Sequence, residues 1–160
     1  MPGAFPLFPA RYLLDTNILI AYARGTDLFR KIEASYGLLA LAASVGIPPG
    51  TPARVPLVSL VSVGEILTFA LYRGWGARRT AALGALLSSL AIVPVARYDL
   101  AERYAEIDAH CRRSGRPLGS KNDLWIAATA SLTGATLLTT DKDFDALDGA
   151  FLNREWIDPA

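Results

Sequence analysis

Four acidic residues of this chain stand where apolar segments end or helical segments begin. They are Asp15, Glu65, Asp123 and Asp141. Parallel strands end at one edge of their sheet, where such sheets bind ligands, so acids placed there would gather together. Carboxylates held close together repel one another unless a cation neutralises them, and an all-oxygen ligand set suits Mg²⁺ or Mn²⁺ better than structural zinc. The sequence therefore predicts a divalent metal site.

Two neutral polar residues are spaced to accompany these acids. Side chains two residues apart point to the same face of a strand, which would place Asn17 beside Asp15 and Thr139 beside Asp141. Neutral groups next to carboxylates orient them and can hold a metal-bound water.

The predicted chemistry is hydrolysis of a phosphodiester. A divalent metal lowers the pKa of bound water and stabilises the phosphodiester oxygens during in-line displacement, so no protein nucleophile is required. Few other catalytic groups are available. His110 is the only histidine and is expected to be structural or solvent-facing, and Cys111, the only cysteine, is expected to pack in the core.

The same acids also have a purely structural interpretation. Asp15 and Asp141 fit helix N-caps. Glu65 fits the third position of a capping box that begins at Ser62, and Asp123 nearly fits another. If all four acids were caps, the chain would be a non-catalytic RNA- or protein-binding module.

A phosphatase with an aspartate nucleophile is a further alternative. Such enzymes usually carry a second acid two residues after the nucleophile, and here Asn17 stands two residues after Asp15. The sequence therefore favours attack by a metal-activated water over phosphoryl transfer to Asp15.

Short apolar strands that alternate with helices would position these residues. We expect strands at 13–14, 55–60, 92–95, 136–140 and 155–157. We expect helices at 18–24, 27–45, 61–72, 77–90, 99–113, 123–132 and 144–147. This alternation is typical of a parallel α/β sheet with helices on both faces, and Gly134 stands where a helix C-terminal cap belongs.

Length and composition limit the possible classes of protein. The 160 residues predict one domain, with an N-terminal extension at 1–10 and a Pro/Gly-rich connecting loop at 46–56. The net charge of +1 carries no overall signature of nucleic-acid binding, so any such surface must be a local patch. A single cysteine excludes an intrachain disulfide and a cysteine zinc cluster. With no signal peptide or membrane span recognisable, we expect a cytoplasmic protein.

Four segments carry a more specific signal: LLDTNILIAY, VSLVSVGEIL, SKNDLWIAATA and LLTTDKDFDAL, in this order over residues 12–147. Together they resemble the PIN-domain family, and within it the VapC-type toxins of toxin–antitoxin pairs. The resemblance implies a PIN-like fold with a central, mostly parallel five-stranded sheet flanked by helices on both faces. It also implies Mg²⁺ or Mn²⁺, endonucleolytic cleavage of RNA, a homodimer and a VapB-like antitoxin that covers or enters the site.

The resemblance also implies roles for individual residues. The acidic quartet would be Asp15, Glu65, Asp123 and Asp141, the neutral companions would be Asn17 and Thr139, and Asp143 would share or replace the role of Asp141. A PIN nuclease of RNA processing, without any antitoxin, fits the same segments. The long Pro-rich region 34–56 departs from compact members of the family, which leaves the partner geometry open.

Basic and apolar segments indicate where RNA and a partner would bind. The loop before Asp123 is surrounded by Arg112, Arg113, Arg116 and Lys121. These side chains would hold RNA phosphates, or they would merely form a solvated basic helix end. The segments LLALAASVGI and ILTFALY are expected to pack in the core, with an antitoxin groove or a dimer seam as the alternative.

Overall fold

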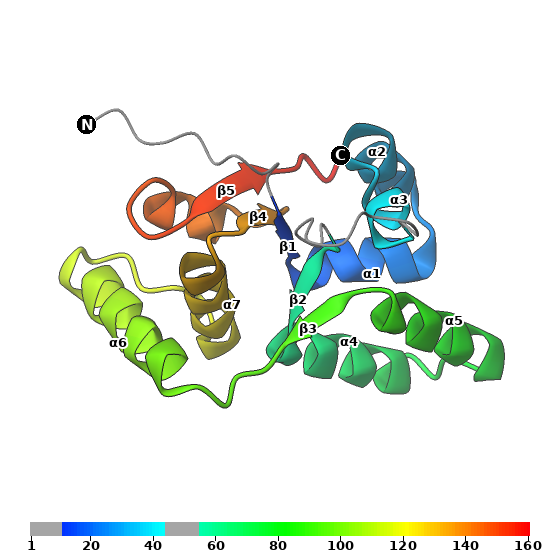
Figure 1. Ribbon diagram of the computed structural model, residues 1–160, viewed down its shortest axis with the longest axis horizontal. Helices are drawn as coiled ribbons and strands as arrows, with labels where there is room; N and C mark the ends of the chain where they lie inside the picture. Colours follow the sequence, from blue (N-terminus) through cyan, green and yellow to red (C-terminus); the bar gives the residue numbers. More distant parts are fainter. Residues whose placement is uncertain (1–10, 44–54) are drawn as a thin grey trace, which may run out of the picture.

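A five-stranded, all-parallel sheet lies at the centre of the protein in the computed structural model, which describes residues 11–43 and 55–160 (Figure 1). The strand order is β3-β2-β1-β4-β5. The strands are β1 (Tyr12–Leu14), β2 (Leu57–Ser59), β3 (Ala91–Val93), β4 (Thr136–Thr139) and β5 (Asn153–Trp156). The predicted parallel α/β sheet is confirmed. The predicted extension at 1–10 and most of the predicted loop at 46–56 lie outside the described residues.

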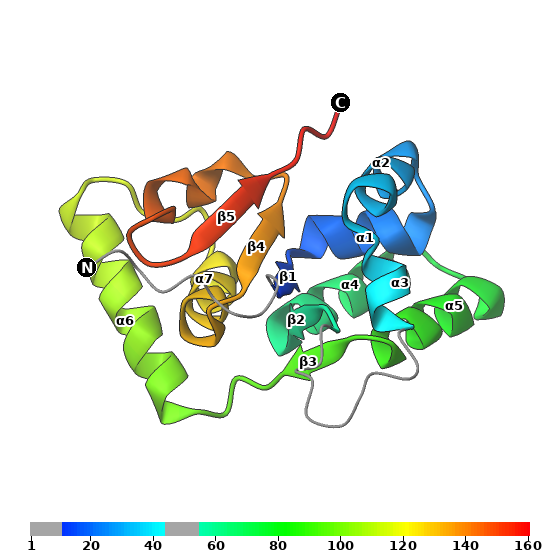
Figure 2. The same cartoon turned by 45° about the horizontal axis from the view of Figure 1, so that its top comes forward.

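Helices cover both faces of this sheet (Figures 1 and 2). On one side lie α1 (Thr16–Arg24), α2 (Asp27–Tyr36), α3 (Leu38–Ala42), α4 (Leu60–Tyr72) and α5 (Ala77–Ser88). On the other side lie α6 (Tyr98–Arg113), α7 (Lys121–Thr133) and the 3₁₀ helix η1 (Lys142–Leu147).

The alternation of side chains along each strand divides the apolar residues between two cores. Leu13 and Leu137 pack with α6, α7 and η1, whereas Leu14 and Leu138 pack with α1, α4 and α5. All four side chains are buried, which explains why these strands are continuous apolar runs instead of alternating polar and apolar residues.

One predicted helix is wrong in its extent. The sequence predicted a single helix at 27–45, but α2 ends at Tyr36 and α3 begins at Leu38. Gly37 separates them with a φ of 59°, a left-handed conformation that ends an α-helix and that glycine adopts without a steric penalty. The predicted helix end at 45 lies outside the described residues. The other elements occur in the predicted order with bounds shifted by a few residues, and Gly134 does cap α7.

The connections place the carboxyl ends of the central strands at a topological switch point. From β1 the chain builds β2 and β3 on one side of the sheet, and it returns through α6 and α7 to add β4 and β5 on the other. Open parallel sheets bind ligands where the strand order reverses in this way. Asp15 directly follows β1, and Asp141 lies two residues beyond the end of β4.

Within residues 11–43 and 55–160, no helix combines the length and the apolar character needed to cross a membrane.

Phe144→Ala should reduce the free energy of unfolding by about 3–5 kcal/mol, because it leaves a cavity in the core on the α6–α7 side. Phe144 is fully buried on η1. The control is Tyr72→Ala on α4. Tyr72 is 89% exposed, so its replacement should change the free energy of unfolding by less than about 0.5 kcal/mol. Urea denaturation measures both values, and equal losses in the two variants would contradict the packing described above.

Candidate metal centre

Asp15 lies at the carboxyl end of β1 and is only 4% exposed. Its Oδ1 accepts a hydrogen bond from the Thr16 N–H at 2.7 Å, which makes it the N-cap of α1. Its Oδ2 accepts a hydrogen bond from the Thr139 hydroxyl at 2.6 Å. Asp15 is therefore a helix cap as the structural interpretation expected, and it is also a buried carboxylate joined to a distant strand.

Thr139 joins the first and the last acid of the predicted quartet. Besides donating to Asp15, its hydroxyl accepts a hydrogen bond from the backbone N–H of Asp141 at 2.9 Å. The sequence placed this hydroxyl beside the Asp141 carboxylate. The structure gives it the Asp15 carboxylate as its acceptor, across the β1–β4 pair of the sheet.

Three acids form the densest part of the centre. One carboxylate oxygen from each of Asp123, Asp141 and Asp143 lies within 4.8 Å of the others. Asp123 is in the first turn of α7, where its N–H donates to the capping hydroxyl of Ser120 at 3.1 Å. Asp141 caps η1 and accepts from the N–H of Asp143 at 2.8 Å. The carboxylate of Asp143 is therefore part of the same cluster as those of Asp123 and Asp141.

Gly119 leaves the space that Asp143 needs. A Cβ atom at position 119 would lie 2.9 Å from Oδ2 of Asp143, closer than real side chains tolerate. The loop between α6 and α7 thus contacts the acidic cluster directly. Sequence reasoning missed this residue, because a glycine in a loop is most simply explained by a turn.

Glu65 approaches the cluster from α4. Its Oε1 accepts a hydrogen bond from the Thr16 hydroxyl at 2.7 Å, and that hydroxyl also lies 3.0 Å from Ser62 Oγ. The capping-box interpretation is wrong here, because Ser59 caps α4 and Ser62 is buried inside the helix. Glu65 also lines a groove of about 580 Å³ together with Val61, Gly64, Thr68 and Asn122.

The strand argument for Asn17 is wrong. The strand ends at Leu14 and helix α1 begins at Thr16, so Asn17 lies in a helix and is exposed. Among the described residues, no hydrogen bond from its side chain is present. The neighbouring Thr16 instead contacts Glu65, although those residues are 49 positions apart in the chain. Nothing in the sequence signalled this contact.

Burial and mutual repulsion oppose the charges of the centre. Burial raises the pKa of Asp15 to about 6, against hydrogen bonds from Thr139 and Thr16 that favour the charged form, and the charges of Asp123 and Asp141 add to the rise. Burial also raises the pKa of Asp123, against the hydrogen bond with Ser120. The charges of Asp141, Glu65 and Asp143 contribute to that second rise.

The donor set suits a hard divalent cation. In the part of the chain that the structure describes, no Lys or Arg forms an ion pair with Asp15, Glu65, Asp123, Asp141 or Asp143. A cation from solution would neutralise the repulsion inside the cluster, and the carboxylate oxygens are ligands that Mg²⁺ and Mn²⁺ prefer. The acidic residues are compatible with divalent metal binding, and caps alone do not explain their convergence.

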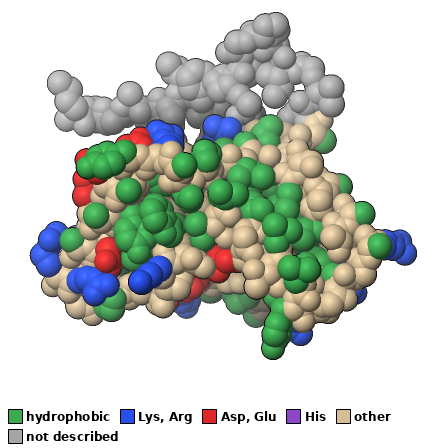
Figure 3. All heavy atoms as spheres, turned by 90° about the horizontal axis from the view of Figure 1, so that it is seen from below, with side chains coloured by type: hydrophobic (Ala, Val, Ile, Leu, Met, Phe, Trp, Pro, Cys, Tyr) green, Lys and Arg blue, Asp and Glu red, His purple; other side chains and the backbone are tan. Residues whose placement is uncertain are grey.

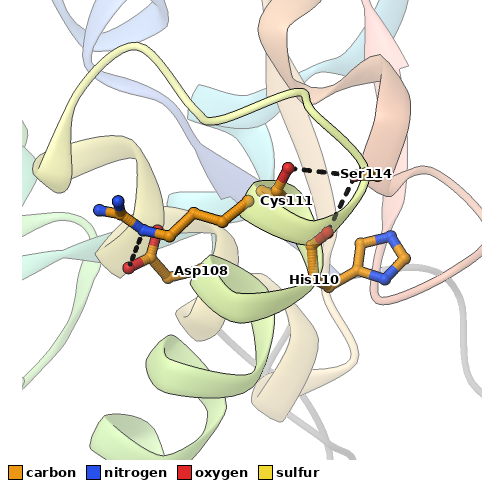
Figure 4. A network of polar contacts seen from close by, with 5 residues as sticks. Asp108, His110, Cys111 and Ser114 are labelled. Carbon is orange, nitrogen blue, oxygen red and sulfur yellow. Dashed lines mark hydrogen bonds and ion pairs between the residues drawn. The ribbon is translucent and has the colours of Figure 1, made fainter.

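The predicted basic loop begins at the end of α6, which is held by local hydrogen bonds (Figure 4). The Ser114 hydroxyl donates to the carbonyl oxygens of His110 at 2.9 Å and Cys111 at 3.1 Å. Arg112 is paired with Asp108 at 3.0 Å. The other predicted basic residues, Arg113, Arg116 and Lys121, are exposed and form no ion pair among the described residues.

The only histidine and the only cysteine stand apart from this chemistry. The His110 ring meets the edge of the Phe151 ring at a centroid distance of 5.1 Å, and among the described residues it has no hydrogen bond to a carboxylate. Cys111 is 1% exposed and packs in the core, as predicted.

A family model and a related protein match most of this chain. The family model described as PIN domain matches residues 12–150. Ribonuclease VapC5 of Mycobacterium tuberculosis is 32% identical over 142 residues, which span 89% of this chain and 91% of that protein.

Solved structures share the fold over most of their length. The VapBC-5 toxin–antitoxin structure from Mycobacterium tuberculosis has a TM-score of 0.60 at 26% identity and covers 93% of this chain and 98% of that chain. FitAcB from Neisseria gonorrhoeae has a TM-score of 0.64 at 25% identity and covers 89% and 96%. VapBC2 from Rickettsia felis, bound to a promoter DNA fragment, has a TM-score of 0.68 at 22% identity and covers 89% and 97%, a likeness of fold alone.

Asp15→Asn should stabilise the metal-free protein increasingly as the pH rises. The folded-state pKa of about 6 exceeds the unfolded value of about 3.9, so the folded state binds this proton more tightly. The resulting stabilisation of wild type is complete below about pH 4, is lost as the pH rises through about 6, and amounts to about 3 kcal/mol. Urea denaturation in EDTA from about pH 4 to about pH 7 should show the free energy of unfolding of the variant rising relative to wild type.

The matched control for this pH series is Asp27→Asn, which removes an exposed acid at the start of α2. Its stability difference from wild type should vary little over the same range. A difference for Asp15→Asn that also stayed constant with pH would contradict the raised pKa.

Proposed function

The chain belongs to the PIN-domain family, and from this premise we propose that it is a metal-dependent endoribonuclease and the toxin of a type II toxin–antitoxin pair. The observation that carries the proposal is the convergence of five carboxylates, without a basic partner, at the switch point of the sheet. The 32% identical relative, which is named as a ribonuclease, supports the proposal.

We assign the metal ligands to Asp15, Glu65, Asp123 and Asp141, with Asp143 as a fifth. Mg²⁺ or Mn²⁺ bound there would supply activation of water and stabilisation of charge on the phosphate oxygens. Hydrogen bonds between side chains orient two of these ligands. Thr139 directs the carboxylate of Asp15, and Thr16 directs that of Glu65, so the remaining oxygen lone pairs of these acids would be available to hold the cation.

RNA would reach the centre along the groove that Glu65 lines. Residues of α4 and of the start of α7 form the walls of this groove, which has a volume of about 580 Å³ beside the Glu65 carboxylate. The loop that contacts Asp143 through Gly119 also carries Arg116 and is followed by Lys121, both exposed. Unpaired cations next to the acids would hold the phosphates on either side of the cleaved bond.

An antitoxin helix would fit an apolar groove on the α1–α5 side of the sheet. A cavity of about 320 Å³ there is lined by Tyr22, Ala23, Phe29, Leu39, Ala82, Ala85, Leu86 and Ser89. Amphipathic helices commonly bind such grooves through one apolar face. The complexes named VapBC among the structural relatives support a partner of this kind.

A second copy of the chain would cover the exposed face of α4. Leu60, Leu67 and Leu71 lie on one side of this helix and are 44%, 44% and 83% exposed. Figure 3, a view from the side of α4, shows hydrophobic side chains gathered over a broad area of this face. The segment ILTFALY is thus only half core, because Ile66 and Ala70 are buried while its leucines are exposed.

Glu65→Gln should reduce RNA cleavage in Mg²⁺ by about 100-fold or more, because it removes a ligand charge while keeping the acceptor for Thr16. Asp15→Asn should have the same effect. The assay follows total RNA and transfer RNA over time, with and without Mg²⁺, and maps the new ends. The control Asp27→Asn should cleave at the wild-type rate, and a fully active Asp15→Asn protein would contradict the proposed function.

Asp123→Asn and Asp143→Asn should each weaken Mn²⁺ binding by about 10-fold or more, measured by calorimetric titration. The control is Asp145→Asn, because Asp145 lies on the same 3₁₀ helix but pairs with Arg154 at 3.1 Å. Equal losses in the control, or no binding by wild type at millimolar Mn²⁺, would contradict the assigned ligands.

A further inference from the structure

Lys142 lies between two acids of the centre but pairs with neither. It is the exposed first residue of η1, with Asp141 before it and Asp143 after it. Among the described residues, no ion pair joins its ammonium group to a carboxylate. Instead, its Nζ lies 4.6 Å from the centroid of the Trp156 ring.

Two side chains of β5 contact charged residues of η1, one through an ion pair and the other through an aromatic ring. Arg154 and Trp156 are two residues apart and therefore share a face of the strand. Arg154 neutralises an acid of η1, because its Nη2 lies 3.1 Å from Oδ1 of Asp145. Trp156 offers a neutral ring to Lys142, and a ring attracts a cation without cancelling its charge. The positive charge of Lys142 stays available to an incoming anion.

The ring that supports Lys142 is itself fixed to the sheet. The Trp156 Nε1–H donates to the carbonyl oxygen of Thr140 at 3.0 Å. In the β4–β5 pairing, Trp156 is the partner of Thr139, the residue that joins Asp15 to Asp141. The ring thus gives the ammonium group of Lys142, the residue between Asp141 and Asp143, a defined site on β5, so the lysine gives up less freedom when it binds a ligand.

We propose that Lys142, seated on Trp156, binds a phosphate oxygen of the RNA next to the bond that is cleaved at the acidic cluster. The inference rests on the proposed function, since it takes RNA as the substrate. A polyanion that approaches several carboxylates is repelled, and a fixed cation between two of them in the chain offsets this repulsion. Lysine suits the task because its ammonium group binds phosphate as a point charge.

The test compares Lys142→Met with Lys142→Arg and with the matched control Arg79→Met. Arg79 also lies over an indole ring, with its Cζ 5.8 Å from the Trp75 centroid, but it stands on α5. The Kd for a labelled single-stranded RNA is measured by fluorescence anisotropy over a salt series in proteins that also carry Asp15→Asn, so that the RNA stays intact. KM and kcat are measured in parallel without that change.

We expect Lys142→Met to raise Kd and KM by about 5-fold to 10-fold and to leave kcat within about 2-fold. The slope of log Kd against log salt should fall by about 0.7, which is the value for one phosphate contact on a single strand. Lys142→Arg should retain most of the affinity. Trp156→Leu should raise Kd in the same direction, and Trp156→Phe, which keeps a ring, should raise it less.

An unchanged Kd and salt slope in Lys142→Met, or a change no larger than in Arg79→Met, would overturn the inference. So would a lower thermal midpoint with an unchanged salt slope, since that result describes a structural lysine. Failure of the wild-type protein to cleave RNA would instead contradict the proposed function. The Kd series would still decide whether Lys142 binds RNA.

Discussion

The hydroxyl of Thr139 holds together parts of the centre that come from opposite ends of the chain. It donates to the carboxylate of Asp15 and accepts from the N–H of Asp141. Because β1 and β4 are neighbours in the sheet, one buried side chain fixes the end of one strand against the turn that follows the other. Asp143 depends on the same turn, since its N–H donates to Asp141 at the start of η1.

The acids at the carboxyl edge of the sheet are electrostatically unfavourable in the metal-free protein. Burial and like charges raise the pKa values of Asp15 and Asp123, so the metal-free centre opposes its own ionisation. The starts of α1 and α7 offset part of that cost, because exposed N–H groups at a helix N-terminus favour negative charge. The remaining repulsion is compatible with binding of a divalent cation, which would neutralise it.

Basic side chains of α6, η1 and β5 divide into those that are paired with a carboxylate and those that are not. Arg112 and Arg154 are paired with carboxylates outside the cluster, at Asp108 and Asp145. Lys142, by contrast, rests on an aromatic ring. Under the proposed function, a negatively charged substrate would meet the available cations first, and the acids would bind the metal.

The sequence by itself determined the parallel sheet and the order of its elements, because the alternation of short apolar strands with helices and the turn residues between them are local properties. It also singled out the acids that we propose as metal ligands. It did not determine which hydroxyl contacts which acid. The Thr16 hydroxyl reaches Glu65, and Gly119 makes room for Asp143. Asn17, expected beside Asp15 on a strand, lies in the helix that begins one residue after Asp15. Only the tertiary structure decided these contacts, because they join distant segments whose spacing depends on how the helices pack against the sheet.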